Sequence, residues 1–166
     1  LIDTDPGEGD NTTPTLENEY WYPLWEKMVE LDVPGLIHST GCKHGRESYS
    51  QHFITEESLA VLQLVHSRVF DDFPKLKIIV AHGGGSVPFH IGRWRADHVL
   101  FHGSTVEDFD QRLKKLYFDT CLHYRKSLEL LIGLVSSDNV VFGTENPGSG
   151  SAPNPETGRS FDDIKP

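Results

Sequence analysis

Five short apolar runs in the sequence each end in a side chain that can bind a metal ion or move a proton. In chain order, these side chains are Asp3, His38, His82, Asp119 and Glu145. Imidazole and carboxylate groups ligate divalent metals, and imidazole also acts as a general acid or base. One histidine after a strand is weak evidence, but five successive runs of this kind predict a shared site.

The runs that carry these side chains have the composition of parallel β-strands. They are β-branched or aromatic without apolar–polar alternation, and they cover residues 1–3, 35–38, 77–82, 116–119 and 140–145. Helical patterns lie between or beside them, at residues 21–32, 54–74, 87–99 and 124–139. Strands alternating with helices predict βαβ units and a parallel sheet. In (β/α)8 barrels the active site lies at the carboxyl ends of the strands, so the five side chains would meet there.

The helix expected between the second and third runs has a clear start signal. Thr55 is the expected N-cap, which places Glu56 and Glu57 in the first turn, where the helix dipole favours negative charge. Ile54 and Leu59 stand at the positions of a hydrophobic staple.

Three glycines follow His82 in the stretch "AHGGGSVPFH". Glycine lets the backbone turn sharply and come close to a ligand. The helix expected to begin near Ser86 would aim its free N–H groups at the site, which favours an anionic substrate. A merely permissive turn is the alternative, but the neighbouring strand ends favour a site.

The composition excludes several other classes of protein. The sequence has 25 acidic and 15 basic residues, and this net charge of −10 repels the phosphate backbone of nucleic acids. No apolar run approaches the roughly 18 residues that cross a bilayer. Cys42 and Cys121 form no CxxC motif, and two lone thiols suit a reducing compartment, so we expect a cytoplasmic protein.

The remaining polar side chains have simpler interpretations. His98 and His102 are spaced to share one helix face, where a solvated face or a contact with the helix C-terminus is expected. His66 is expected to be structural. For Asp119, a buried hydrogen-bonding role is favoured over catalysis.

The stretches "VAHGGGSVPFHIGRWR", "LYFDTC" and "DNVVFGTENPG" resemble the amidohydrolase superfamily. The resemblance is to the branch of aminocarboxymuconate-semialdehyde decarboxylase, resorcylate-type decarboxylases and 4-oxalomesaconate hydratase, and it is greatest to the hydratase. It implies a (β/α)8 TIM barrel, of which residues 1–166 would form the C-terminal part, strands 4 or 5 to 8, of a single domain. Residues 146–166 would be the loop or tail after strand 8. No His-x-His pair occurs in the sequence. Either the segment that carries the strand-1 ligands is not included here, or this chain cannot hold the metal as members of the superfamily do.

The resemblance also implies roles for individual residues. His38 would be a metal ligand, His82 a ligand or the catalytic acid or base, and Glu145 a ligand or catalytic base. The metal would be a divalent ion, zinc first and manganese as the alternative.

Substrate-binding roles are expected for four residues on other grounds. Arg46 and Arg93 are chosen for their charge, and Gly84 for the close approach that glycine allows. His52 lies in the loop expected after residues 35–38, where a surface position is the alternative.

The expected function is that of a metal-dependent lyase or hydrolase acting on a small carboxylated substrate, most like the hydratase. Two alternatives stay open: a non-oxidative decarboxylase of the same branch, and a non-catalytic barrel protein that lacks the strand-1 ligands. The expected partners are a small anionic carboxylate and further copies of the same chain in a homo-oligomer, with neither nucleic acid nor membrane.

Overall fold

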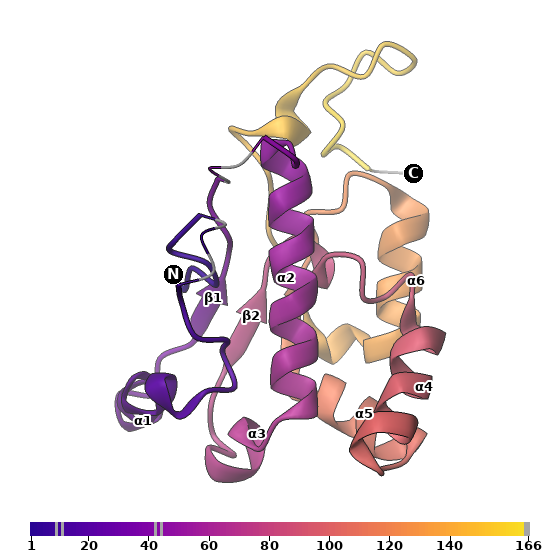
Figure 1. Ribbon diagram of the computed structural model, residues 1–166. Coiled ribbons are helices and arrows are strands. Elements are labelled where there is room, and N and C mark those ends of the chain that lie inside the picture. The colour runs from indigo at the N-terminus through magenta and orange to yellow at the C-terminus, as the bar shows by residue number, and fades with distance from the viewer. Residues whose placement is uncertain (9, 11, 42, 44, 165–166) are drawn as a thin grey trace.

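The centre of the molecule is a sheet of four parallel strands in the order β1-β2-β3-β4, of which β1 and β2 are labelled in Figure 1. The computed structural model describes residues 1–8, 10, 12–41, 43 and 45–164, so Cys42 lies outside the described residues. The strands are β1 Gly35–Ile37, β2 Ile78–Val80, β3 Leu116–Asp119 and β4 Val140–Val141. The N-terminal segment extends the sheet through a parallel bridge between Ile2 and Ile37. All five predicted runs therefore contribute to one sheet.

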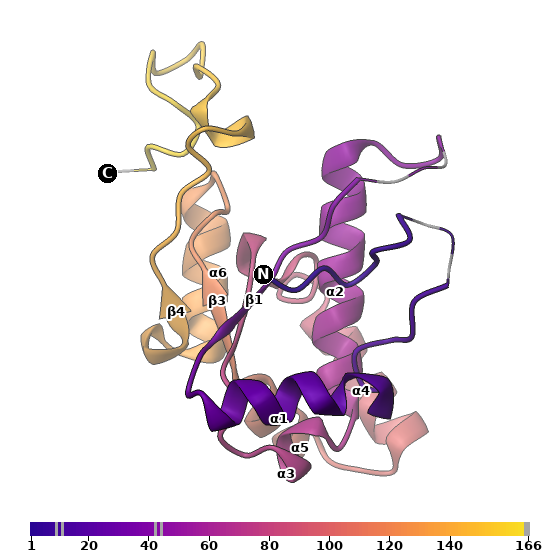
Figure 2. The same ribbon diagram turned by 90° about the vertical axis from the view of Figure 1, so that its left-hand side faces the viewer.

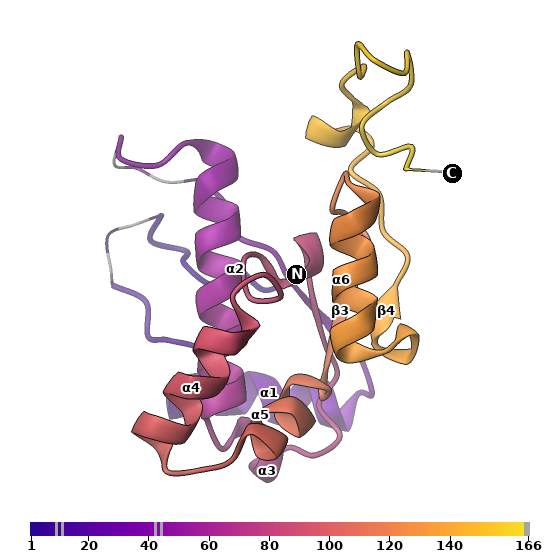
Figure 3. The ribbon, with the colours of Figure 1, turned by 90° about the vertical axis from the view of Figure 1, so that its right-hand side faces the viewer.

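Helices connect and cover the strands. They are α1 Tyr22–Glu30, α2 Tyr49–His66, α3 Val69–Asp72, α4 Ile91–His102, α5 Val106–Leu113 and α6 Arg125–Val135. Helix α2 runs along the strands, and α1 crosses the end where the strands begin (Figure 2). Helix α6 lies beside β3 and β4, and the C-terminal segment rises beyond the opposite end of the sheet (Figure 3). Within the described residues, every helix is too short or too polar to cross a bilayer.

The apolar core lies between the sheet and its helices. Ile37 and Phe118 on the strands and Val61 and Leu64 on α2 are at most 1% exposed, and they belong to one cluster. The intervening strand residues, such as Ile79, are half-buried. In this chain, therefore, one face of the sheet is fully covered, whereas the sequence predicts burial on both faces.

Helix α2 begins earlier than the sequence predicts, so the N-cap assigned to Thr55 is wrong. Ser48 caps the helix, and its side chain and that of Gln51 form a reciprocal capping box. Thr55 instead turns its hydroxyl to the Gln51 carbonyl, 2.9 Å away, inside the helix. The expected staple is also absent, since Ile54 is 38% and Leu59 is 44% exposed. The capping box of Ser48 and Gln51, upstream of Thr55, therefore marks the start of α2.

Helix α5 is an element that the patterns above do not predict. Thr105 caps it by accepting a hydrogen bond from the Asp108 N–H, and Phe109 and Leu113 are its buried residues. Its buried face consists of these two apolar residues, four positions apart, which is too short a pattern to predict a helix from the sequence.

Candidate active site

Three of the predicted side chains meet beyond the carboxyl ends of the strands. His38, His82 and Glu145 each offer a ligand atom, and these atoms all lie within 4.8 Å of one another. His38 follows β1 directly, whereas Ala81 separates His82 from β2, and residues 142–144 separate Glu145 from β4. The strands are therefore shorter than predicted, but their parallel direction still brings the three side chains to one edge of the sheet.

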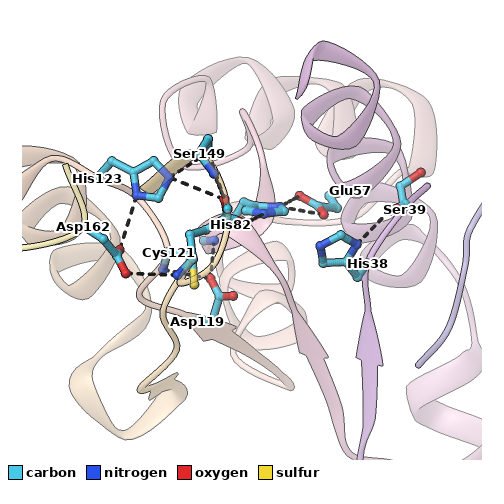
Figure 4. Close-up of polar contacts among 12 residues, drawn as sticks. His38, Ser39, Glu57, His82, Asp119, Cys121, His123, Ser149 and Asp162 are labelled. Carbon is cyan, nitrogen blue, oxygen red and sulfur yellow. Dashed lines mark hydrogen bonds and ion pairs between the residues drawn. The ribbon is translucent and has the colours of Figure 1, made fainter. Parts of the chain in front are cut away.

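The ring of His38 is oriented by the backbone of the next residue. Its Nδ1 lies 2.7 Å from the carbonyl oxygen of Ser39, a contact drawn in Figure 4. A carbonyl oxygen can only accept, so Nδ1 carries the proton and Nε2 keeps its lone pair. The ring centroid of His38 lies 5.1 Å from that of His82. His38 is thus arranged as a metal ligand would be, with its second nitrogen already engaged.

His82 lies between two carboxylates. Its Nδ1 is 2.8 Å from Oε1 of Glu57, a contact drawn in Figure 4. Its Nε2 is 3.0 Å from Oε1 of Glu145. Burial disfavours the charged imidazole, but the hydrogen bonds to Glu57 and Glu145 outweigh this and raise the pKa of His82 to about 9. The two carboxylates therefore favour an imidazolium at this position.

Glu57 belongs to this site, although the sequence predicted for it only a place in the first turn of a helix. Its exposed fraction is 0%, and burial raises the pKa of its carboxyl despite the hydrogen bond from His82. A signal for this was present, because Glu57 shares a helix face with Ala60, Val61 and Leu64 at i+3, i+4 and i+7, all buried. A carboxylate on an apolar helix face requires a buried partner.

The Glu145 carboxylate is held from its other side by the C-terminal segment. Oε2 of Glu145 accepts a hydrogen bond from the Ser149 hydroxyl at 2.9 Å. The backbone N–H of Glu145 donates to Oδ2 of Asp162 at 3.0 Å. Burial alone would raise the pKa of Glu145, but the hydrogen bonds from His82 and Ser149 lower it. His123 lies 3.8 Å from the same carboxylate. The chain after β4 therefore takes part in the site.

The three glycines after His82 serve the packing of the protein itself. Gly83, Gly84 and Gly85 have φ angles of +61°, +82° and +65°, which favour glycine. A Cβ on Gly84 would lie 2.7 Å from the Phe118 ring, and one on Gly85 would lie 2.6 Å from the carbonyl oxygen of Ile54. The close approach is thus to neighbouring elements, whereas the sequence analysis expected an approach to a ligand.

The predicted anion site at a helix N-terminus near Ser86 is wrong. Helix α4 begins only at Ile91, and the residues before it form turns. The Ser86 N–H donates to the hydroxyl of Ser58 at 2.8 Å, so it is engaged within the protein. Val87 is buried, and its burial holds this segment as a turn against the core.

Asp119 has the buried hydrogen-bonding role expected from the sequence. Its Oδ1 accepts from the N–H groups of Gly83 and Cys121, at 3.0 and 3.1 Å. These bonds tie the end of β3 to the turn that carries His82. Burial raises the pKa of the Cys121 thiol, which keeps it protonated and argues against a nucleophile.

A cavity of about 480 Å³ opens beside the three convergent side chains. Its lining includes Tyr49, Phe53, Leu122 and His123, and among the described residues that line it there is neither lysine nor arginine. A carboxylate substrate would therefore take its positive partners from the histidines and from a bound metal.

The four residues predicted to bind substrate do not line this cavity. Arg46 and Arg93 are exposed, and Gly84 is packed against Phe118. His52 is 2% exposed and lines a different cavity on another side of α2. The geometry thus gives no support to a substrate contact for these residues, and their roles stay predictions. Gly85 is the glycine of the triplet that lines the cavity.

Parallel strands that carry possible metal-ligand side chains beyond their carboxyl ends are typical of metal-dependent (β/α)8 barrels. The family model described as "Amidohydrolase" matches residues 2–166, and the chain belongs to this family. The predicted fold is confirmed: the four strands and their helices form part of a (β/α)8 barrel.

Two hydratases and one decarboxylase are among the proteins similar to this chain. The chain is 36% identical over 165 residues to 2-keto-4-carboxy-3-hexenedioate hydratase of Sphingobium sp., covering 99% of this chain and 48% of that protein. The crystal structure of 4-oxalomesaconate hydratase, LigJ, from Rhodopseudomonas palustris superposes with a TM-score of 0.83 at 36% identity, covering 97% of this chain and 46% of that one. The 2-amino-3-carboxymuconate-6-semialdehyde decarboxylase of Dictyostelium discoideum is 28% identical over 149 residues, covering 80% and 40%. The chain thus spans half or less of the length of each of these three relatives.

Proposed function

We propose that this chain carries the catalytic groups of a metal-dependent hydro-lyase that adds water to a small unsaturated oxo-dicarboxylic acid. The observation that carries the proposal is the convergence of His38, His82 and Glu145, whose ligand atoms lie within 4.8 Å of one another. The resemblance to the two hydratases, at 36% identity over nearly the whole chain, supports this reaction in particular.

The donor set fits a divalent metal ion. Imidazole nitrogen and carboxylate oxygen together are the ligands that zinc takes in catalytic sites, so we propose zinc, with manganese as the alternative. His38 would ligate through Nε2, because its Nδ1 faces the Ser39 carbonyl. Glu145 would contribute a carboxylate oxygen. When bound, the metal would supply Lewis acidity toward the substrate carboxylate and toward water.

We assign the proton transfers to His82 and Glu145. Hydration of a double bond requires one proton to reach a carbon atom and another to leave a water molecule. Nε2 of His82 and Oε1 of Glu145 are 3.0 Å apart, within reach of the same reacting water. Glu57, behind Nδ1, holds the ring of His82 with Nε2 toward the cavity and balances its positive charge. Glu145 would accept the proton that leaves the water, and His82 would donate its Nε2 proton to the carbon atom. The proton held by Glu145 would then pass to Nε2 of His82, 3.0 Å away, and restore both groups for the next turnover.

A second reaction, non-oxidative decarboxylation, has a specific observation in its favour. The chain is 28% identical over 149 residues to a decarboxylase of a carboxylated, unsaturated semialdehyde. Decarboxylation would use the same groups, with His82 protonating the carbanion that remains after carbon dioxide leaves. Geometry alone therefore does not separate the two reactions, and a direct assay must do so.

The test is a side-by-side assay of the purified full-length protein. Unsaturated oxo-dicarboxylic acids are followed by loss of their conjugated ultraviolet absorbance, and hydroxybenzoic acids by release of carbon dioxide. We expect hydration, its loss after chelator treatment, and recovery on adding back zinc or manganese. A metal-loaded protein that is folded but acts on neither class of acid would contradict the proposal and favour a non-catalytic barrel protein.

Two wider properties also belong to the proposal. We propose a cytoplasmic location, which is supported by the free, buried thiol of Cys121. We also propose a homo-oligomer, which light scattering of the full-length protein would test. A monomer at micromolar concentration would contradict the second of these.

A further inference from the structure

A second group of ligand atoms lies on the other side of α2 from the candidate active site. Asp5, His52 and Glu56 each offer a ligand atom, and these atoms lie within 4.8 Å of one another. They line a cavity of about 220 Å³, which shares none of its lining residues with the cavity beside His82. The group is therefore separate from the site described above.

Two members of this group come from one turn of helix. His52 and Glu56 are four residues apart on α2, so their side chains emerge on the same face. Asp5 belongs to the N-terminal segment and closes the group from outside the helix. Asp5 is 8% and His52 is 2% exposed, so the group is not a set of solvated surface acids.

The state of His52 points to a ligand. Its Nδ1 lies 3.0 Å from Oε2 of Glu47, which can only accept, so Nδ1 carries a proton. Its Nε2 is buried and has no hydrogen-bond partner among the residues that the structure describes. The nearest acid is Oδ2 of Asp5 at 3.5 Å, outside hydrogen-bond geometry. A carboxylate behind Nδ1 with Nε2 aimed at further carboxylates is how proteins orient a metal-binding histidine.

The charge of the cavity also favours a cation. Its lining includes the three carboxylates of Asp5, Glu47 and Glu56 against the one imidazole of His52, and the described lining holds neither lysine nor arginine. Burial and the neighbouring Asp5 raise the pKa of Glu56, as expected where negative charges gather. The hydroxyl of Thr4 contacts Glu56 at 3.4 Å and adds a further oxygen.

We propose that Asp5, His52 and Glu56 form a second divalent-metal site, distinct from the site of His38, His82 and Glu145. One imidazole and two carboxylates suit a first-row divalent ion such as Zn²⁺ or Mn²⁺. An ion held there joins the N-terminal segment to α2. The next residue of α2 is Glu57, so this ion would stabilise the helix that orients His82.

The test counts metal ions bound to the full-length protein. Variants are dialysed against Zn²⁺, washed through a desalting column and measured by inductively coupled plasma mass spectrometry. We expect about two ions per chain in the unmodified protein, one in His38→Ala, one in Glu56→Gln and none in the double variant. Glu107→Gln, on the exposed side of α5, is the matched control and should leave two.

A thermal melt with and without Zn²⁺ supplies a second measurement. In the His38→Ala background, Zn²⁺ should raise the Tm, and Glu56→Gln should remove that rise. Glu47→Gln should weaken binding to the second site about 10- to 100-fold, as expected for a residue that only orients the histidine. Equal metal content and an equal Tm rise with and without Glu56→Gln would overturn the proposal.

Discussion

Two clusters of histidines in this chain have opposite surroundings. At the carboxyl ends of the strands, His82 lies between Glu57 and Glu145, and its pKa is raised to about 9. Between α2 and α4, His66 stacks on His102 with ring centroids 4.2 Å apart, and its pKa is lowered to about 4. The same side chain is thus held charged in one place and neutral in the other. Burial and then the neighbouring imidazoles lower the pKa of His66, whereas hydrogen bonds to two carboxylates outweigh burial at His82.

The comparison separates the proposed catalytic site from a cluster of histidines that packs in the interior. His98, in the second cluster, is 2% exposed and bonds through Nε2 to Oδ2 of Asp108 at 2.9 Å. A solvated face or a contact with the helix C-terminus was expected for His98. The solvated face is wrong, because Asp108 and Phe109 of α5 contact the His98 ring. Three histidines lie close together there, but the described residues that offer metal-ligand geometry do not include them. A group of histidines is therefore not by itself a metal site.

The largest expected contrast is between His38→Ala and His98→Ala. His38→Ala should lower kcat/KM about 1,000-fold. A catalytic metal lowers the activation barrier by several kcal/mol, and each 1.4 kcal/mol changes the rate about tenfold. His98→Ala should keep kcat/KM but lower the free energy of unfolding by about 1–3 kcal/mol, because Asp108 loses a buried partner. Steady-state kinetics and urea titration of both variants decide. Retained activity in His38→Ala would break the distinction between the two clusters.

The second contrast replaces one carboxylate by a neutral carboxamide in each cluster. Glu57→Gln removes the charge behind His82 and should lower kcat about 10- to 100-fold with little change in KM. Asp108→Asn should leave kcat unchanged and lower the free energy of unfolding by about 1–2 kcal/mol, since the Asp108 carboxylate also accepts hydrogen bonds from the Ser104 hydroxyl and from Nε of Arg112. The two variants are compared by kinetics and by thermal melting. Equal effects on kcat would argue against a positioning role for Glu57.

The smallest effect expected is on the pH dependence of stability. Burial, then the charges of His102 and His98, lower the pKa of His66 from 6.5 to about 4. The unfolded chain therefore binds the proton first, so stability is full above about pH 6.5 and is lost as the pH falls toward 4. The slope is at most about 1.4 kcal/mol per pH unit. His66→Phe keeps a stacked ring without titration, and urea titrations at pH 7, 6 and 5 should show a shallower loss. An unchanged slope would contradict the assignment.

Much of the architecture could be predicted, because it follows from repeated local patterns. Unbroken apolar runs such as residues 77–82 are typical of parallel strands, and parallel strands place their last residues at one edge. That rule alone brings His38, His82 and Glu145 together, even though the strands end earlier than predicted. The start of α2 could not be fixed in this way, because Ser48 and Thr55 both stand where an N-cap could lie. The helix begins after Ser48, which forms a capping box with Gln51.

The surroundings of the site were harder to predict, because they depend on loops and on helix rotation. Glu57 faces His82 only because α2 turns that face to the core, which the misplaced helix start obscured. Arg46 and Arg93 were chosen for their charge, but charge does not say which way a loop or a helix directs a side chain. His52 was predicted to contact substrate from the loop after β1, yet it lies within α2 and turns toward Asp5.

The most direct measurement is anomalous X-ray scattering from crystals of the full-length protein grown with Zn²⁺ and recorded on both sides of the zinc edge. The convergence of three strand-end side chains predicts a strong peak within bonding distance of Nε2 of His38 and the Glu145 carboxylate. An ordered map with His38 and Glu145 in place, saturating zinc in the crystal and no peak between them would contradict a metal-dependent reaction at this site.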